Sequence, residues 1–103
     1  MPSDRAVNVE LRYFAGCPNW ETTRRLIESI TGRPPVLRRV DTTAEAEAMG
    51  FSGSPTVIVE GVDPWADQTS AVGLACRIYR APDGRMVGGP TEEMLTRALD
   101  DRL

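Results

Sequence analysis

An apolar segment near the start of the chain runs directly into a cysteine–proline pair, within VNVELRYFAGCPNW (residues 7–20). Apolar and polar residues alternate up to Tyr13, which is the period-two pattern of a strand with one buried face. Gly16 ends this strand. Pro18 suits the first position of a helix, because its missing N–H would have no partner within the helix. The segment therefore predicts a strand that delivers Cys17 to the start of a helix.

The position of Cys17 favours a reactive thiol. The first turn of a helix carries unpaired N–H groups and a partial positive charge, so a sulfur atom placed there is easier to deprotonate. The backbone amides of Asn19 and Trp20 are the expected stabilising groups, and Cys17 is the candidate nucleophile. The alternative is a structural role, since free cysteine also packs as a small hydrophobic residue.

The rest of the chain alternates between helical and strand periodicity. The predicted elements are a helix over 19–30, an edge strand over 36–41, a helix over 43–49, strands over 56–60 and 76–80, and a last helix from Thr91. An irregular segment, 62–75, separates the last two strands. The order βαβ followed by αββα predicts an α/β thioredoxin-like fold (βαβ-αββα), with a four-stranded mixed sheet flanked by helices.

Length and composition limit the domain organisation and the location of the protein. A chain of 103 residues forms one domain, 1–103, and we expect its polar residues 1–6 to be a flexible N-terminus. The start of the chain has no apolar signal-peptide core, and no stretch approaches the ~20 apolar residues of a membrane span. We therefore expect a cytoplasmic protein that does not bind membranes. All 12 basic residues are arginine, which fits the codon usage of a GC-rich bacterium.

Charge and residue counts exclude several functions. The net charge is −3 and the arginines are interleaved with acids, so we expect no nucleic-acid partner. Two cysteines are too few for a disulfide scaffold or for a cysteine-only zinc or iron–sulfur site. The chain has no histidine, the commonest metal ligand and catalytic base. We expect no cofactor and no resident metal.

Two short segments resemble thioredoxin-like proteins. YFAGCPNW (residues 13–20) resembles the turn that carries their redox motif, and GFSGSPTVIVEG (residues 50–61) resembles the segment that carries their cis-proline. An X-Pro bond adopts the cis form far more readily than other peptide bonds. The resemblance implies that Ser54, Pro55 and Thr56 flank Cys17, with Pro55 in the cis form, and that this turn binds the backbone of a substrate.

The chain departs from this family at the position of its second cysteine, which is Trp20 here. The resemblance therefore implies an atypical, single-cysteine member. It would use Cys17 for thiol–disulfide exchange or small-thiol capture, with a small thiol or a protein disulfide as its partner. The alternative is a non-catalytic binding module that uses the cis-proline face or the loop 62–75. The sequence leaves open the oligomeric state and whether the protein is an enzyme.

Cys76 is a possible second thiol. Antiparallel pairing of the strands 56–60 and 76–80 would place it about four residues from the Pro55 turn and so ~13 Å from Cys17, which predicts a core residue. If the loop 62–75 folds back, the two cysteines become a non-adjacent redox pair or a two-thiolate site for a soft metal. GLACRIY (residues 73–79) resembles a cysteine segment of organomercurial lyases, which use two distant cysteines and an aspartate. Asp63 and Asp67 are the candidate acids on the loop.

Overall fold

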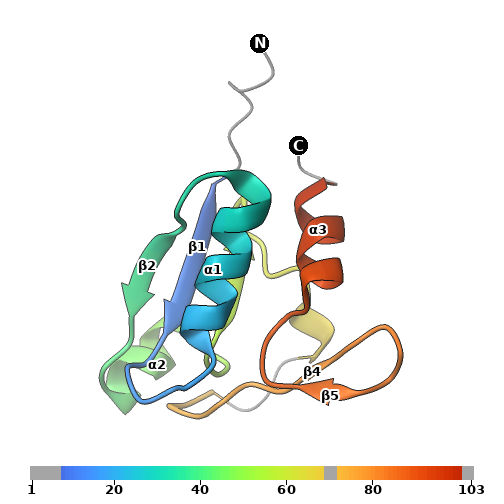
Figure 1. Cartoon of the computed structure of the whole chain (residues 1–103). Helices are drawn as coiled ribbons and strands as arrows, with labels where there is room; N and C mark the ends of the chain where they lie inside the picture. The colour runs from blue at the N-terminus through green and yellow to red at the C-terminus, as the bar shows by residue number, and fades with distance from the viewer. Residues whose placement is uncertain (1–7, 69–71, 101–103) are drawn as a thin grey trace.

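A computed structural model describes residues 8–68 and 72–100 (Figure 1), which form a mixed α/β structure. In chain order the elements are β1 (Val9–Tyr13), α1 (Trp20–Thr31), β2 (Val36–Arg39), α2 (Thr43–Met49), β3 (Thr56–Val59), the short 3₁₀ helix η2 (Ala66–Gln68), β4 (Tyr79–Arg80), β5 (Met86–Val87) and α3 (Glu92–Asp100). The expected flexible N-terminus, 1–6, and the tip of the irregular loop, 69–71, lie outside the described residues. Within the described ranges, no helix is long and apolar enough to cross a membrane.

The central sheet has three strands in the order β2-β1-β3. β2 is parallel to β1, with Leu37 opposite Leu11, and β3 is antiparallel to β1, with Val57 opposite Leu11. The first crossover is therefore the predicted βαβ unit. All four residues of β2 are exposed, as expected of an edge strand with two arginines.

The core lies on the side of the sheet covered by α1 and α3, which lie side by side (Figure 1). The alternation in β1 turns Val9 and Leu11 into this core, and Ile27 of α1 meets them there. A fully buried aliphatic side chain contributes roughly 1.5–3 kcal/mol relative to an exposed one. The core residues are Val9, Leu11, Ile27, Val57, Val59, Leu95 and Leu99.

Local signals set the helix ends. Thr42 and Glu45 form a capping box at the start of α2, and Gly50 ends that helix in the left-handed region at φ 67°. Gly32 ends α1 in the same way, at φ 75°. The Thr91 hydroxyl accepts a hydrogen bond from the Met94 N–H at 3.1 Å, which is the expected cap of α3. The predicted helices are therefore confirmed to within two residues.

The segment 76–80 does not join the central sheet as a fourth strand. Only its end is a strand, β4, and β4 pairs with β5 in a separate antiparallel hairpin. Cys76 instead lies opposite Ser54 in an isolated parallel bridge. The segment thus runs along the turn that precedes β3, and not antiparallel to β3 as predicted.

Candidate functional site

Cys17 lies between β1 and α1, as predicted, and is only 3% exposed. Its N–H donates to the Phe14 carbonyl at 3.0 Å, which holds the loop in a tight turn. The Asn19 N–H donates to the Cys17 Sγ atom at 3.4 Å, so the Asn19 amide has the expected place. Among the described residues, no hydrogen bond joins the Trp20 N–H to this sulfur. The Trp20 side chain stacks on Tyr13, with ring centroids 4.0 Å apart.

The Ser54–Pro55 peptide bond is cis, as predicted, and its turn lies beside Cys17. The Cys17 thiol donates to the Ser54 carbonyl at 3.5 Å, and the Ser54 hydroxyl accepts from the Phe14 N–H at 3.4 Å. Ser54, Pro55 and Thr56 are all buried. This turn and Cys17 are therefore brought together as the sequence suggested.

The backbone of Ser54, however, is already bonded to another part of the same chain. Its N–H donates to the Ala75 carbonyl at 2.8 Å, and its carbonyl accepts from the Arg77 N–H at 2.9 Å. These are the groups that were expected to bind the backbone of a substrate. The segment 75–77 therefore occupies that edge of the cis-proline turn.

Cys76 lies at the centre of that segment, and this corrects its predicted position. It is an exposed free thiol, and not a core residue ~13 Å from Cys17. The pKa of Cys76 is raised, first by partial desolvation and then by the neighbouring Cys17 thiol, through charge repulsion and hydrogen bonding. The prediction was wrong because it assumed antiparallel pairing with β3. The parallel bridge to Ser54 brings Cys76 back toward Cys17.

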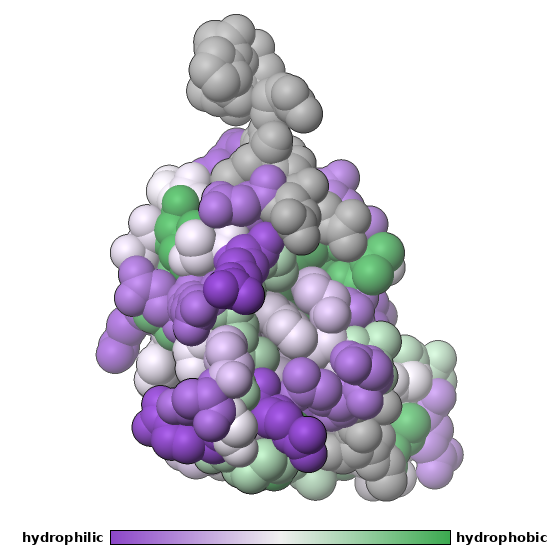
Figure 2. Space-filling model, turned by 90° about the vertical axis from the view of Figure 1, so that its right-hand side faces the viewer, coloured by the Kyte–Doolittle hydropathy of each residue, from purple (hydrophilic) through white to green (hydrophobic). Residues whose placement is uncertain are grey.

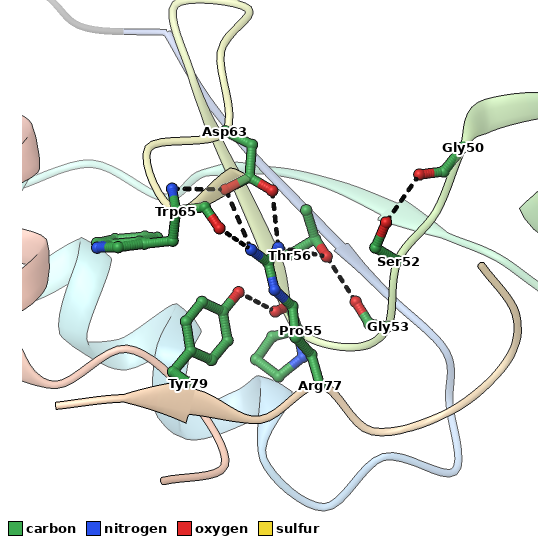
Figure 3. Close-up of polar contacts among 9 residues, drawn as sticks. All are labelled: Gly50, Ser52, Gly53, Pro55, Thr56, Asp63, Trp65, Arg77 and Tyr79. Atoms are coloured by element: carbon green, nitrogen blue, oxygen red, sulfur yellow. Dashed lines mark hydrogen bonds and ion pairs between the residues drawn. The ribbon is translucent and has the colours of Figure 1, made fainter. Parts of the chain in front are cut away.

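Arg77 anchors the segment (Figure 3), and its side chain is fully buried. Its Nη1 atom donates to Asp63 Oδ2 at 2.8 Å and to Thr56 Oγ1 at 3.3 Å, and its Nη2 atom donates to the Trp65 carbonyl at 2.6 Å. The guanidinium also lies 4.5 Å from the centre of the Tyr79 ring. We call Thr56, Asp63, Trp65, Arg77 and Tyr79 the Arg77 anchor.

Tyr79 ties the Arg77 anchor to the cis-proline turn. Its hydroxyl donates to the Pro55 carbonyl at 2.6 Å, and its ring meets Trp65 edge to face with centroids 5.7 Å apart. Burial raises the pKa of Tyr79 well above its ordinary value, so the hydroxyl stays a donor at neutral pH. Sequence reasoning missed both Arg77 and Tyr79. The available signal was the presence of Arg77 and Tyr79 on one face of the segment 76–80, with an acid, Asp63, on the preceding loop.

Two glycine sites allow close packing around the cysteines. A Cβ atom on Gly53, whose φ is 111°, would lie 2.9 Å from the Arg77 Cβ and 3.1 Å from its Cα. A Cβ atom on Gly89 would lie 2.9 Å from the Thr23 hydroxyl and 3.5 Å from Pro55 Cγ. The segment before α3 therefore packs against α1 and the cis-proline turn.

The site thus combines a buried thiol that accepts an amide hydrogen bond with an exposed thiol beside it. Asp63, a predicted candidate acid, is bound to Arg77, and among the described residues no hydrogen bond joins it to either sulfur. In residues 8–68 and 72–100 no group of three or more histidine, cysteine or acidic side chains could hold a metal ion. Within that part of the chain, two sulfur atoms are the only apparent soft-metal ligands at this site. No protein-family model, curated protein or solved structure matches the chain.

Proposed function

We propose that this protein is an atypical thioredoxin-like oxidoreductase that catalyses thiol–disulfide exchange with Cys17 and Cys76 as its reversible pair. The observation that carries the proposal is that both free thiols lie against Ser54 of the cis-proline turn: the buried Cys17 thiol donates to the Ser54 carbonyl at 3.5 Å, and the exposed Cys76 lies opposite Ser54 in the parallel bridge. The strand-to-helix turn at Cys17 and the βαβ unit support the thioredoxin-like part of the proposal. The departure is that the second thiol comes from a distant segment and not from the first turn of α1.

The burial of Cys17 and the exposure of Cys76 support an order for the two steps. The Cys76 thiolate attacks a substrate disulfide, forms a mixed disulfide and releases the first substrate thiolate. The Cys17 thiolate then attacks the Cys76 sulfur, forms the Cys17–Cys76 disulfide and releases the second substrate thiolate. Two electrons pass from the protein dithiol to the substrate disulfide. A second, external dithiol restores the reduced pair by the same two exchanges in reverse.

This order differs from the expectation that Cys17 attacks first. A substrate sulfur needs an open path to the attacking thiolate, and the 3% exposure of Cys17 does not offer one. Once Cys76 is held in the mixed disulfide, the Cys17 thiolate is the attacking group of the second step. The Asn19 amide, 3.4 Å from Cys17 Sγ, stabilises that thiolate for the second step. A reducing cytoplasm would supply the external thiol.

The test is turnover of bis(2-hydroxyethyl) disulfide, a small neutral substrate, with dithiothreitol as the external dithiol. We expect Cys76→Ser to abolish the catalysed rate. In a separate reaction without dithiothreitol, Cys17→Ser should stop after the first step, at a mixed disulfide on Cys76 that mass spectrometry detects. Unchanged turnover by Cys76→Ser would contradict the proposal and would favour exchange through Cys17 alone. An unaltered chain that adds nothing to the uncatalysed rate would also contradict the proposal and would favour the non-catalytic binding module.

The pairing of the two free thiols also favours a second candidate, the binding of a soft metal ion. Two thiolates with no third ligand in the described residues suit linear, two-coordinate binding. This candidate predicts a complex of one copper(I) ion per chain in an anaerobic titration, lost when either cysteine is replaced by serine. Binding that survives either replacement would contradict it.

A further inference from the structure

The segment that carries Cys76 exposes one of its two faces. From residue 76 to residue 81, exposed and buried side chains alternate strictly. Arg77 and Tyr79 point into the Arg77 anchor, whereas Cys76, Ile78 and Arg80 are exposed. Residues two apart in an extended segment share a face. The attacking thiol, an apolar side chain and a guanidinium therefore follow one another along one line, which we call the Cys76 track.

Exposed apolar side chains gather on this part of the chain. Seven large hydrophobic residues are exposed in the described ranges, and four of them lie within residues 72–86. On the side of α3 and the β4–β5 hairpin, apolar patches are small and bordered by polar residues (Figure 2). The four are Val72, Leu74, Ile78 and Met86. Ile78 lies two residues from Cys76 on the same face, and Met86 lies opposite Arg80 in the β4–β5 pair, so an apolar side chain of a partner could bury these two along the track.

The Cys76 track ends at the positively charged side chain of Arg80. Arg80 forms no ion pair with an acid of the described residues, whereas the neighbouring Arg85 is paired with Asp83. Arg80 also lines a groove of about 360 Å³ between η2 and α3. Trp65, Met94 and Arg97 also line this groove, and the Arg97 guanidinium is paired with Glu93 at 3.2 Å. A partner carboxylate is the complementary group, although the chain as a whole is negative at −3.

A substrate must dock on this outer line, because the inner edge is filled. The Ser54 backbone groups are bonded to Ala75 and Arg77, and displacing that segment would unpair a fully buried arginine from Asp63 at 2.8 Å. Breaking such a pair is strongly unfavourable. The Cys76 track is therefore the surface on which a partner can approach the exposed sulfur.

We infer that the preferred substrate is a polypeptide disulfide, bound in an extended conformation along the Cys76 track. Its apolar side chains would contact Ile78, and an acidic side chain would reach Arg80. Cys76 and Arg80 are four residues apart, roughly 13 Å in an extended chain, so that acid lies about four residues from the partner's cysteine. This span exceeds the length of a small disulfide. The inference rests on the proposed exchange reaction and names its substrate class.

The test compares peptide disulfides that carry either glutamate or lysine four residues to each side of the cysteine. We expect kcat/KM about fivefold higher for the glutamate peptide, the scale of an exposed ion pair. Arg80→Glu should reverse this preference and leave turnover of bis(2-hydroxyethyl) disulfide unchanged. Arg85→Glu, a matched charge reversal in the neighbouring hairpin turn, should leave the preference as it is.

The outcomes separate the two proposals. Equal rates for both peptides, or the same reversal by Arg85→Glu, would overturn binding of the peptide along the Cys76 track. The exchange reaction would still stand if both cysteines remained necessary for turnover of the small disulfide. Faster turnover of the small disulfide than of the glutamate peptide would overturn it as well. Turnover of the small disulfide by Cys76→Ser would instead overturn the exchange reaction itself.

Discussion

The two cysteines reach the same place by different physical means. Cys17 is positioned by its own neighbourhood, through the Phe14 carbonyl and the first turn of α1. Cys76 is positioned from a distance, through the bridge to Ser54 and the burial of Arg77 against Asp63. Cys17 is therefore held by a local turn, whereas Cys76 is held by contacts with residues that are distant in the sequence. Damage to the anchor should therefore affect Cys76 much more than Cys17.

The largest expected effect comes from Asp63→Asn. It removes the carboxylate from a fully buried guanidinium, and leaving such a charge unpaired costs about 3–5 kcal/mol. We expect a large drop in the free energy of unfolding, measured by urea denaturation. Asp83→Asn, which breaks an exposed ion pair with Arg85, should leave that free energy unchanged within error. Equal effects of the two substitutions would show that Arg77 does not depend on Asp63.

The next-largest effect is expected at Gly53, which packs against the segment that carries Cys76. Gly53→Ala adds a methyl group 2.9 Å from the Arg77 Cβ in a backbone with φ 111°, whereas Gly61→Ala places one in open space at φ 81°. Both substitutions place a side chain on a backbone with positive φ, which destabilises the fold by about 1–2 kcal/mol, but only Gly53→Ala also strains the segment 75–77. We expect Gly53→Ala to be about 2 kcal/mol more destabilising in urea denaturation, the scale of an overpacked contact. Equal destabilisation by the two substitutions would show that the segment 75–77 does not pack against Gly53.

The smallest effect concerns the reactivity of Cys76 as a function of pH. Its pKa is raised, so its thiolate is scarce at neutral pH, and its alkylation rate should keep rising above the pH at which an ordinary cysteine levels off. Replacing Cys17 by serine removes the charge repulsion, so the rate of Cys76 should rise at lower pH. Iodoacetamide labelling followed by mass spectrometry measures both rates. An unchanged pH profile in Cys17→Ser would show that the two thiols do not interact.

The local structure around Cys17 could be predicted from the sequence, whereas the long-range placement of Cys76 could not. The period-two pattern of β1, Pro18 after Cys17 and Gly50 after α2 are local signals, and each predicted its element. The cis-proline turn came from a resemblance and is present. The place of Cys76 depends on Arg77, a charge that is buried only because Asp63 and the Trp65 carbonyl meet it. Periodicity carries no information about such partners, and the default antiparallel pairing therefore gave the wrong position.

The central claim is that Cys17 and Cys76 form a reversible pair, and the mass of the oxidised protein tests it most directly. The reduced full-length chain is treated with a limiting amount of bis(2-hydroxyethyl) disulfide at low protein concentration, and the products are mapped by peptide mass spectrometry. We expect a monomer with one internal Cys17–Cys76 disulfide, fully restored to two thiols by dithiothreitol. Adducts that stay on Cys76, or dimers linked through Cys76, with Cys17 still a thiol, would contradict it.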